Sequence, residues 1–254
     1  MKSSTLLFLI GFSLLVVLAA GDPLLAQQQG PGASGVQINF GPESESFSLP
    51  LKIVIVLTML AFLPAMIISM TSFTRIIIVV HFLRQALGTQ SAPNNQILIG
   101  LTLFLTFFVM GPVWDQVYEE AVVPYQEGTL TELDALAAAS VPLRNFMVRN
   151  VRQDDLALFV KMGKLPQPKG PEELPLRVIV PAFMISELKT AFQIGFVLFL
   201  PFLVIDMVVS SVLLSTGMMM LPPIIISTPF KILLFILVDG WNLVVGSLVE
   251  SFPH

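Results

Sequence analysis

The chain has 254 residues, of which 55% are hydrophobic and 12% are charged, and this composition indicates a membrane protein because a soluble domain carries about 25% charged residues. The formal net charge is -4 and no basic stripe is present to follow phosphates, so we expect no nucleic-acid partner. The chain has no cysteine and only two histidines, which excludes disulfides, cysteine nucleophiles and histidine-rich metal centres, and we expect no cofactor.

The first 26 residues are typical of a cleaved signal peptide. Lys2 precedes an apolar run from Leu6 to Ala20, and small residues follow it. Cleavage is expected after Ala26, with Ala20 or Gly21 as alternatives. An uncleaved first helix is the alternative. Residues 27–50 are rich in Gln, Gly, Ser and Pro, so we expect a flexible extracytoplasmic leader there.

Residues 51–112 are expected to form a first helical hairpin. Its first helix, Leu51 to Met70, is long and apolar enough to cross a bilayer. Thr71 to Gln96 carries basic residues and no acidic one, which favours a cytoplasmic position, although its apolar middle suggests a helix in contact with partners. The second helix, Ile97 to Met110, is short and is expected to end at Gly111-Pro112.

Residues 113–177 have the composition of a small helical extracytoplasmic insertion, with ten acidic and seven basic residues. Leu143, Phe146, Met147 and Val151 have the spacing of one buried face of a helix. The proline-rich segment from 164 to 171 then predicts a linker. The insertion is too short for a large core of its own, so we expect it to pack against neighbours.

Residues 178–249 are expected to form the second hairpin, followed by a short polar tail at 250–254 that we place outside. Its first arm begins with the polar signature from Ser186 to Lys189 and continues through an almost wholly apolar run. Gly217, three consecutive methionines, and then Pro222 and Pro223 end this arm and predict a turn between the two arms.

Five charged residues lie in the apolar segments of the second hairpin: Glu187, Lys189, Asp206, Lys231 and Asp239. Such charges are costly in a membrane, so we expect each to be paired within the chain or between subunits. Asp206 and Asp239 lie at similar distances from Leu221-Pro222, so a hairpin centred there places them at one depth. Two such carboxyls are the pattern of an intramembrane aspartyl protease, but the Gly-x-Gly-Asp element of that class is absent and Lys231 offers Asp206 a partner. We therefore expect no enzyme.

Met218, Met219 and Met220 follow Gly217 directly. Methionine is a common filler of apolar interiors, which is one interpretation. Consecutive residues on a broken turn point in different directions, however, so the alternative is that these flexible thioethers line a constriction.

Six stretches contain long and specific motifs: Thr71–Val79, Leu87–Pro93, Ser186–Phe196, Pro201–Asp206, Gly217–Met220 and Val238–Trp241. They resemble the FliP family of flagellar biosynthesis proteins, the flagellar counterpart of the R subunit of injectisome type III secretion gates. The resemblance covers nearly the whole chain from Leu51 onward and is weakest at 27–50 and in parts of 121–175.

The resemblance implies a pore-forming subunit of the flagellar export gate, in the bacterial inner membrane and the flagellar basal body. About five copies would form a helical channel assembly with the Q subunits and one R subunit, near the larger export-gate membrane proteins and the basal-body ring. Unfolded rod, hook and filament proteins would pass through the channel. The resemblance further implies that Met218, Met219 and Met220 form the gasket of the pore, and that the helices sit higher than hydropathy suggests.

The sequence therefore predicts an all-α membrane protein with about four membrane-type helices in two hairpins. The alternative function is an ion or small-solute transporter with broken helices. Such a transporter is expected to carry an internal inverted repeat, and none is visible between 51–112 and 178–249.

Overall fold

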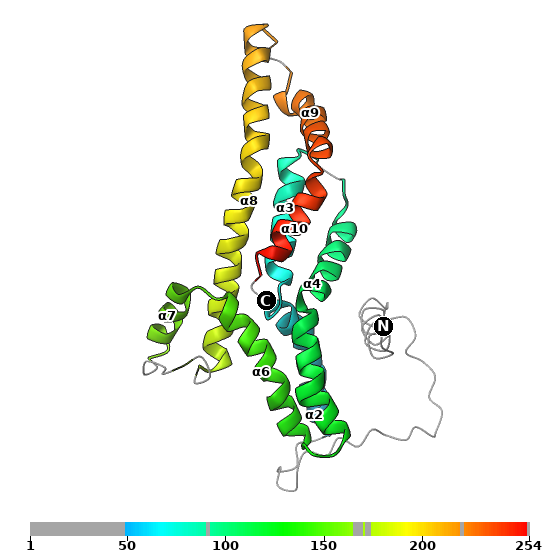
Figure 1. Cartoon of the computed structure of the whole chain (residues 1–254), viewed down its shortest axis with the longest axis vertical. Coiled ribbons are helices and arrows are strands. Elements are labelled where there is room, and N and C mark those ends of the chain that lie inside the picture. Colours follow the sequence, from blue (N-terminus) through cyan, green and yellow to red (C-terminus); the bar gives the residue numbers. More distant parts are fainter. Residues whose placement is uncertain (1–48, 90–91, 165–169, 171–173, 219–220, 253–254) are drawn as a thin grey trace, which may run out of the picture. The chain divides into compact units, whose positions relative to one another are not determined.

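The protein is helical throughout the part of the chain that the computed structural model describes, which comprises residues 49–89, 92–164, 170, 174–218 and 221–252. The expectation of an all-α protein is thereby confirmed. The predicted signal peptide and nearly all of the predicted leader lie outside these residues. The elements, in chain order, are α2 (Leu49–Ser69), α3 (Phe73–Ala86), α4 (Asn95–Val117), the π-helical turn η1 (Tyr118–Val122), α5 (Val123–Gln126), α6 (Glu132–Asn150), α7 (Gln153–Met162), α8 (Leu176–Ser215), α9 (Pro223–Leu237) and α10 (Gly240–Glu250) (Figure 1).

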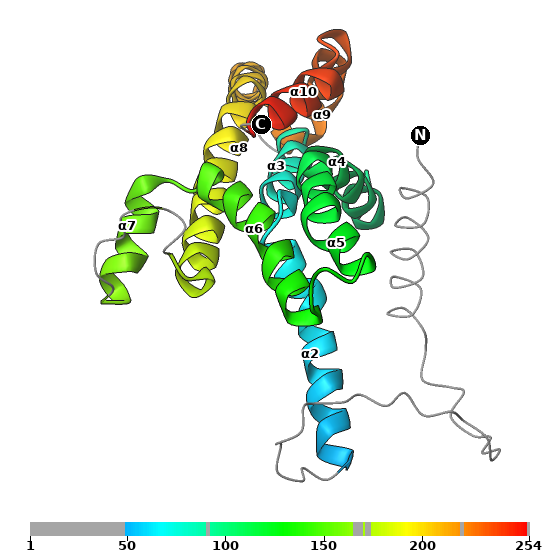
Figure 2. The same cartoon turned by 60° about the horizontal axis from the view of Figure 1, so that its bottom comes forward.

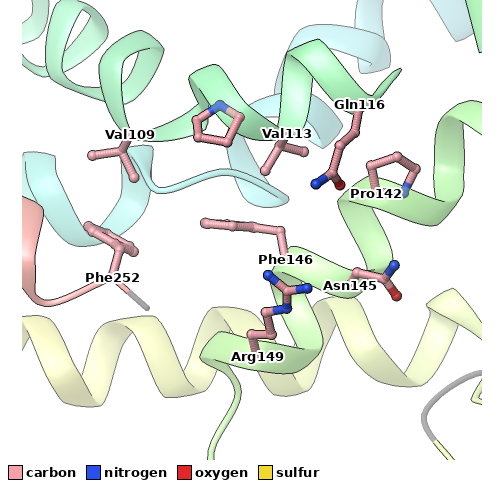
Figure 3. Close-up of a pocket in the computed structure, with 9 residues that line it drawn as sticks. Val109, Val113, Gln116, Pro142, Asn145, Phe146, Arg149 and Phe252 are labelled. Atoms are coloured by element: carbon pink, nitrogen blue, oxygen red, sulfur yellow. The ribbon is translucent and has the colours of Figure 1, made fainter. Parts of the chain in front are cut away.

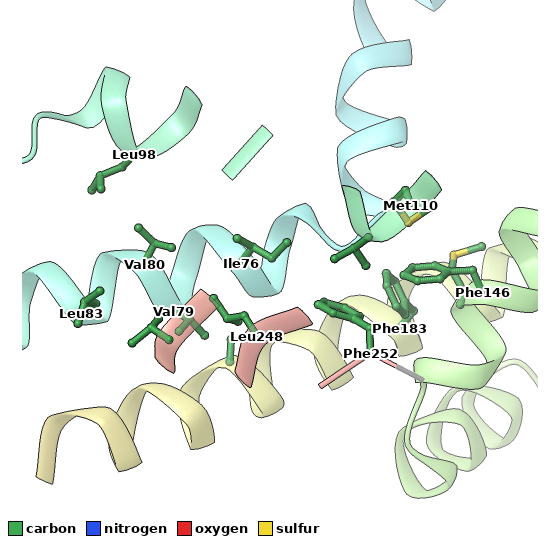
Figure 4. Packing of buried hydrophobic residues seen from close by; sticks show 14 of the residues in the cluster. Ile76, Val79, Val80, Leu83, Leu98, Met110, Phe146, Phe183, Leu248 and Phe252 are labelled. Carbon is green, nitrogen blue, oxygen red and sulfur yellow. The ribbon is translucent and has the colours of Figure 1, made fainter. Parts of the chain in front are cut away.

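Helix α3 lies at the centre of the unit formed by residues 52–254. It packs most extensively on α8 and also contacts α4. Its buried side chains recur at helical spacing, which is why a stretch with three basic residues folds inward rather than standing in water. They join aromatic residues of α6, α8 and the tail in one cluster, shown in Figure 4. The α3 members are Ile76, Val79, Val80, Leu83 and Ala86.

Helices α3 and α8 run in the same direction. Arg75 at the start of α3 bonds to Glu187, and Phe82 one to two turns later stacks edge-on with Phe192 at 5.5 Å between ring centroids. Phe82 also lies so close to Gly195 that a Cβ there would come within 2.6 Å of its ring. A side chain at position 195 would therefore push α3 and α8 apart.

Helix α4 does not end at Gly111-Pro112 as the sequence predicts. It continues through Pro112 to Val117, and with η1 and α5 it forms a helical stretch of 32 residues, Asn95–Gln126. A proline inside a helix removes one hydrogen bond and kinks it, but packing on both sides holds this helix together. Met110 is fully buried, and Trp114 packs against the core. The expected boundary between the first hairpin and the insertion thus falls inside a helix.

The insertion is built from the end of α4, η1, α5, α6 and α7. Phe146, Met147 and Val151 are buried and Leu143 packs beside them, so the predicted face of α6 is the one that meets the core. Thr131 caps the start of α6 by accepting a hydrogen bond from the amide of Asp134. Helix α7 lies against α8, as both views show (Figures 1 and 2).

Within the described part of the chain, two single helices are long and apolar enough to cross a membrane, Asn95–Gln126 and Leu176–Ser215. The number rises to four when α2 with α3, and α9 with α10, are each counted as one bent span. The bend between α9 and α10 is 66°. The second arm of the second hairpin is therefore broken, whereas the sequence predicts a single continuous arm from 224 to 249.

Candidate functional site

Helix α8, which has 40 residues, carries three of the charged residues predicted as site residues: Glu187, Lys189 and Asp206. Its first half is packed among α3, α6 and α7, and its second half pairs with α9. Ser186 and Glu187 are both fully buried, whereas Lys189, two residues on, has a side chain that is 52% exposed. Neighbouring residues of a helix point in different directions, so these side chains reach different elements.

Arg75 and Glu187 form a buried ion pair that ties four segments together. The Nε of Arg75 donates to Oε2 of Glu187 at 2.7 Å, and its Nη2 donates to the other carboxylate oxygen. Its Nη1 donates to the backbone carbonyl of Ser251 at 2.7 Å, and Nη2 reaches Oδ1 of Asn150 at 3.5 Å. The guanidinium also lies 3.9 Å from the ring centroid of Phe252. A buried ion pair offsets the cost of leaving water only when further hydrogen bonds occupy its remaining donors and acceptors, as they do here.

This junction corrects the predicted sidedness of the chain. The sequence places Arg75 in a cytoplasmic stretch, and places the insertion and the tail on the outer side. Arg75 bonds directly to Asn150 of the insertion and to Ser251 of the tail, so the three lie at one level. The rule that basic loops face the cytoplasm applies to charges in water, and Arg75 is 3% exposed and paired.

Ser186 and Lys189 fasten α7 to α8. The hydroxyl of Ser186 donates to Oδ2 of Asp155 at 2.9 Å and accepts from the amide of Arg152 at 2.8 Å, where α7 begins. The ammonium of Lys189 donates to the other oxygen of Asp155. This hydrogen bond lowers the pKa of Asp155 below its ordinary value, although burial acts in the opposite direction. The signature from Ser186 to Lys189 thus binds α3 on one side and α7 on another, and both partners belong to the same chain.

Asp206 and Lys231 join the two arms of the second hairpin. Nζ of Lys231 donates to Oδ2 of Asp206 at 2.6 Å, and the hydroxyl of Ser227 donates to Oδ1 at 2.6 Å. Lys231 is 3% exposed and Asp206 is 31% exposed. The turn after α3 reaches the same place, because a Cβ at Gly88 would lie 2.9 Å from Oγ1 of Thr228.

Asp239 does not lie at the depth of Asp206. Asp206 faces Lys231, and Asp239 lies eight residues, or about 12 Å at the helical rise, farther along the returning arm. The expected centre of the turn, Leu221-Pro222, is too late, because α9 begins at Pro223 directly after it. Asp239 is exposed, adopts a left-handed backbone with φ +51°, and accepts a hydrogen bond from Asn242 at 3.2 Å. It forms the break before α10.

The turn at the end of α8 is built around Gly217. Its φ is +73°, its amide donates to Leu214, and the amide of Met218 donates to Leu213 at 3.1 Å. These two bonds make a Schellman motif, which satisfies carbonyls at the helix end. Met218 is 54% exposed, while Met219 and Met220 lie outside the described residues. Pro222 and Pro223 then start α9, since proline suits a first helical turn.

A cavity of about 120 Å³ lies beside the Arg75 junction, between α4 and α6 (Figure 3). Val109, Val113 and Phe146 form its apolar wall, Arg149 lies at its edge, and Phe252 closes one side. Phe252 stacks on Phe146 with 6.3 Å between ring centroids. The tail therefore belongs to the packed interior, whereas the sequence predicts a polar tail in water.

The polar junctions also use residues that the sequence does not predict as site residues, among them Arg75, Asn150, Asp155, Ser227 and Ser251. Arg75 carries a local signal, because this cation directly precedes the apolar run from Ile76 to Val80. Asn150 and Asp155 belong to an amphipathic stretch with many polar residues, so nothing in the local pattern distinguishes them.

Comparisons with known proteins agree with this architecture. The family model described as FliP family matches residues 56–248. A flagellar biosynthetic protein FliP from Pectobacterium carotovorum is 56% identical over 208 residues, which cover 82% of this chain and 81% of that protein. Its counterpart in Bacillus subtilis is 52% identical over 217 residues, covering 85% and 98%. That of Caulobacter vibrioides is 49% identical over 242 residues, covering 95% and 91%.

These relatives are named flagellar biosynthetic proteins, and the FliP family is not known to be enzymatic, which agrees with the expectation that the chain is not an enzyme. By the extent of the family match and the identity to these relatives, the chain belongs to the FliP family.

Proposed function

We propose that this chain is a pore-forming subunit of the flagellar type III protein export gate. In this role several copies, about five, form a helical channel assembly with the Q and R subunits in the inner membrane, within the flagellar basal body. Unfolded rod, hook and filament proteins pass through the assembly, which makes the chain necessary for building the flagellum. Membership of the FliP family, whose relatives are named flagellar biosynthetic proteins, supports this proposal.

The observation that supports a pore most strongly is the shape of the α8–α9 hairpin. Helix α8 has 40 residues and spans about 60 Å at 1.5 Å per residue, twice the thickness of a hydrocarbon core. One half is anchored by Arg75, Asn150 and α7, and the other half projects to the turn at Gly217. Such a hairpin can place its turn at Gly217 on the axis of a pore that lies away from the packed core.

The surface of the projecting half supports a position among other subunits. It is apolar on several sides at once, with the Asp206–Lys231 pair held between its two arms. A helix that is apolar all round is buried, in lipid or among other helices. The exposed residues are Leu203, Val204, Met207, Val208, Val212 and Leu214 on α8, and Ile224, Ile225, Phe230, Leu233, Ile236 and Leu237 on α9.

The methionine turn supplies the seal in this proposal. Several copies of Met218, Met219 and Met220 around one axis form a narrow apolar ring, and such a ring excludes water and ions when it is empty. Thioether side chains with three rotatable bonds yield to a passing polypeptide of any sequence. Gly217 ends α8 with a left-handed backbone and Pro223 begins α9, so the seal residues lie between the two helices.

The test is to replace Met218, Met219 and Met220 together with alanine in the whole gate. We expect the assembly to form, native mass to be unchanged, and ion conductance to rise several-fold. Met66→Ala, at an exposed methionine on α2, is the matched control and leaves conductance unchanged. A triple variant that assembles and stays as tight as the parent would show that these residues are not the seal.

The proposed localisation includes a cleaved signal peptide at residues 1–26. The mature protein then begins near Gln27, and its intact mass is lower than that of the full chain by the mass of this segment. A membrane-inserted protein that still contains Met1 would reject this part of the proposal.

A further inference from the structure

Charge is unevenly distributed over the insertion, residues 113–177. From residue 115 to residue 134 every charged residue is acidic, and the basic residues begin at Arg144. We call the first group the acidic end; its exposed carboxylates are Asp115, Glu119, Glu120, Glu127, Glu132 and Asp134. We call the second group the basic end; its exposed cations are Arg149, Arg152, Lys161, Lys164 and, at the start of α8, Arg177.

The acids within the basic end do not cancel its charge. Asp155 is buried and occupied by Lys189 and Ser186. Asp154 is exposed, so it is the acid that solvent meets among the described residues of this end. The five exposed cations of the basic end therefore outnumber its exposed acid, Asp154, among the described residues.

Each end also exposes a pair of large apolar side chains. Leu133 and Leu136, near the start of α6, are 80% and 70% exposed, and they lie three residues apart on one helix face. Leu158 and Met162, on α7, are 48% and 68% exposed and lie four residues apart, again on one face. Each pair is bordered by charges, those of the acidic end around the leucines and those of the basic end around Leu158 and Met162.

The two ends face away from each other. Helix α6, which separates them, has 19 residues and is about 28 Å long. Both views place α7 at one side of the insertion and α5 with the start of α6 at the other (Figures 1 and 2). The leucines and the α7 pair of one molecule therefore cannot cover each other.

We infer that the acidic end of one copy binds the basic end of the next copy, with Leu133 and Leu136 packed against Leu158 and Met162. The partner is a second copy because this chain carries both halves of a complementary pair on opposite ends. A contact of this kind joins two different surfaces, so it repeats from copy to copy and closes into a ring when the rotation fits. The inference rests on the proposed function in that it names the surface by which its copies would meet.

The two components of this contact have different roles. The apolar pairs leave water on binding and supply the stability of the contact. The charged borders sit in water and chiefly guide association, fix the register and disfavour the contact of two like ends. Added salt is therefore expected to change the association rate of the contact more than its dissociation rate.

The chain contains no cysteine, so a pair of introduced cysteines reports the contact directly. The full-length protein carrying Leu136→Cys and Met162→Cys, assembled in membranes with its gate partners, is treated with a bis-maleimide cross-linker. We expect a ladder of covalent multimers. Each single cysteine variant is expected to stay monomeric under the same treatment, because like ends do not meet.

Dimers of the Leu136→Cys variant alone would overturn the proposed head-to-tail contact in favour of a symmetric one. In another contrary outcome, the paired variant gives no ladder while native mass still shows a multi-copy assembly. That result would overturn the inference and leave the proposed function standing. Absence of any multi-copy assembly would contradict both.

Charge exchange gives an independent test. Glu127→Lys with Glu132→Lys, or Lys161→Glu with Lys164→Glu, is expected to reduce the ladder at least five-fold, and all four changes in one chain are expected to restore it. Glu250→Lys, at an exposed position on α10, is the control and leaves the ladder unchanged. A four-fold exchanged chain that cross-links no better than either double variant would contradict the pairing of these charges.

Discussion

Arg75 and Glu187 are 112 positions apart in the chain and share a buried two-pronged ion pair, with the Nε of Arg75 2.7 Å from Oε2 of Glu187. Their side chains are 3% and 0% exposed. The guanidinium has further bonds to Ser251 and Asn150, so one cation connects α3, α6, α8 and the tail. This side chain therefore helps to fix the position of the long helix α8 relative to the insertion, together with the link from Ser186 and Lys189 to Asp155.

Glu187→Ala is expected to destabilise the folded chain by about 3–5 kcal/mol, because it leaves the guanidinium of Arg75 buried without its counter-ion. Replacing both residues, by Arg75→Met with Glu187→Met, is expected to cost less than the sum of the two single changes. Chemical unfolding of the purified protein in detergent measures these values. Glu250→Ala is the exposed control, and a purely additive double variant would contradict the coupling.

Asp155 gives the link between α7 and α8 a dependence on acid. Its pKa is lowered in the folded chain, chiefly by the hydrogen bond from Lys189, so its contribution to stability is complete above about pH 4, the ordinary pKa of aspartate. The contribution is lost as the pH falls through the lower folded-state pKa. Asp155→Asn is expected to be less stable than the parent at pH 6, and the difference is expected to shrink towards pH 2.

Asp154→Asn is the matched control, since its side chain is exposed on the same helix. It is expected to follow the parent at every pH. Urea midpoints measured from pH 6 to pH 2 test both variants. A gap between Asp155→Asn and the parent that stays constant down to pH 2 would show that this carboxylate does not stabilise α7 through its charge.

The Asp206–Lys231 pair is expected to respond unequally to the loss of either partner. Lys231 is 3% exposed, so Asp206→Ala leaves a buried ammonium and costs about 3–5 kcal/mol. Asp206 is 31% exposed on the chain, so after Lys231→Met its carboxylate is less enclosed by the chain and keeps the hydrogen bond from Ser227. The yield of assembled gate, measured by native mass, is expected to fall further for Asp206→Ala. Equal losses would indicate that the two groups are equally accessible in the assembly.

Local patterns in the sequence predict the features that depend on near neighbours. The apolar spacing of Ile76, Val79 and Leu83 indicates a helix with one buried face, and the structure has α3 there. Gly217 followed by the two prolines predicts the end of α8, because the left-handed backbone of a Schellman motif favours glycine.

Features that depend on distant parts of the chain could not be predicted in this way. The Gly111-Pro112 pair is a local stop signal, and α4 crosses it because Met110 is buried by segments far along the chain. Asp155 lies 34 residues from Lys189, and its role appears only when α7 folds onto α8. Charge counting favours a cytoplasmic position for Arg75 and does not reveal its burial, since its partner Glu187 belongs to another helix.

Asp239 and Gly240 set the break between α9 and α10 through their backbone rather than through charge. Asp239 has φ +51°, which costs a residue other than glycine about 1–2 kcal/mol, and a Cβ at Gly240 would lie 2.2 Å from the ring of Phe235. Asp239→Gly is therefore expected to assemble and support motility like the parent, whereas Asp239→Val, which is β-branched, and Gly240→Ala are expected to fail. Complementation of a non-motile strain, with immunoblots for protein level, measures this. If Asp239→Gly fails while Asp239→Val works, the carboxylate or its bond to Asn242 matters and the backbone explanation is wrong.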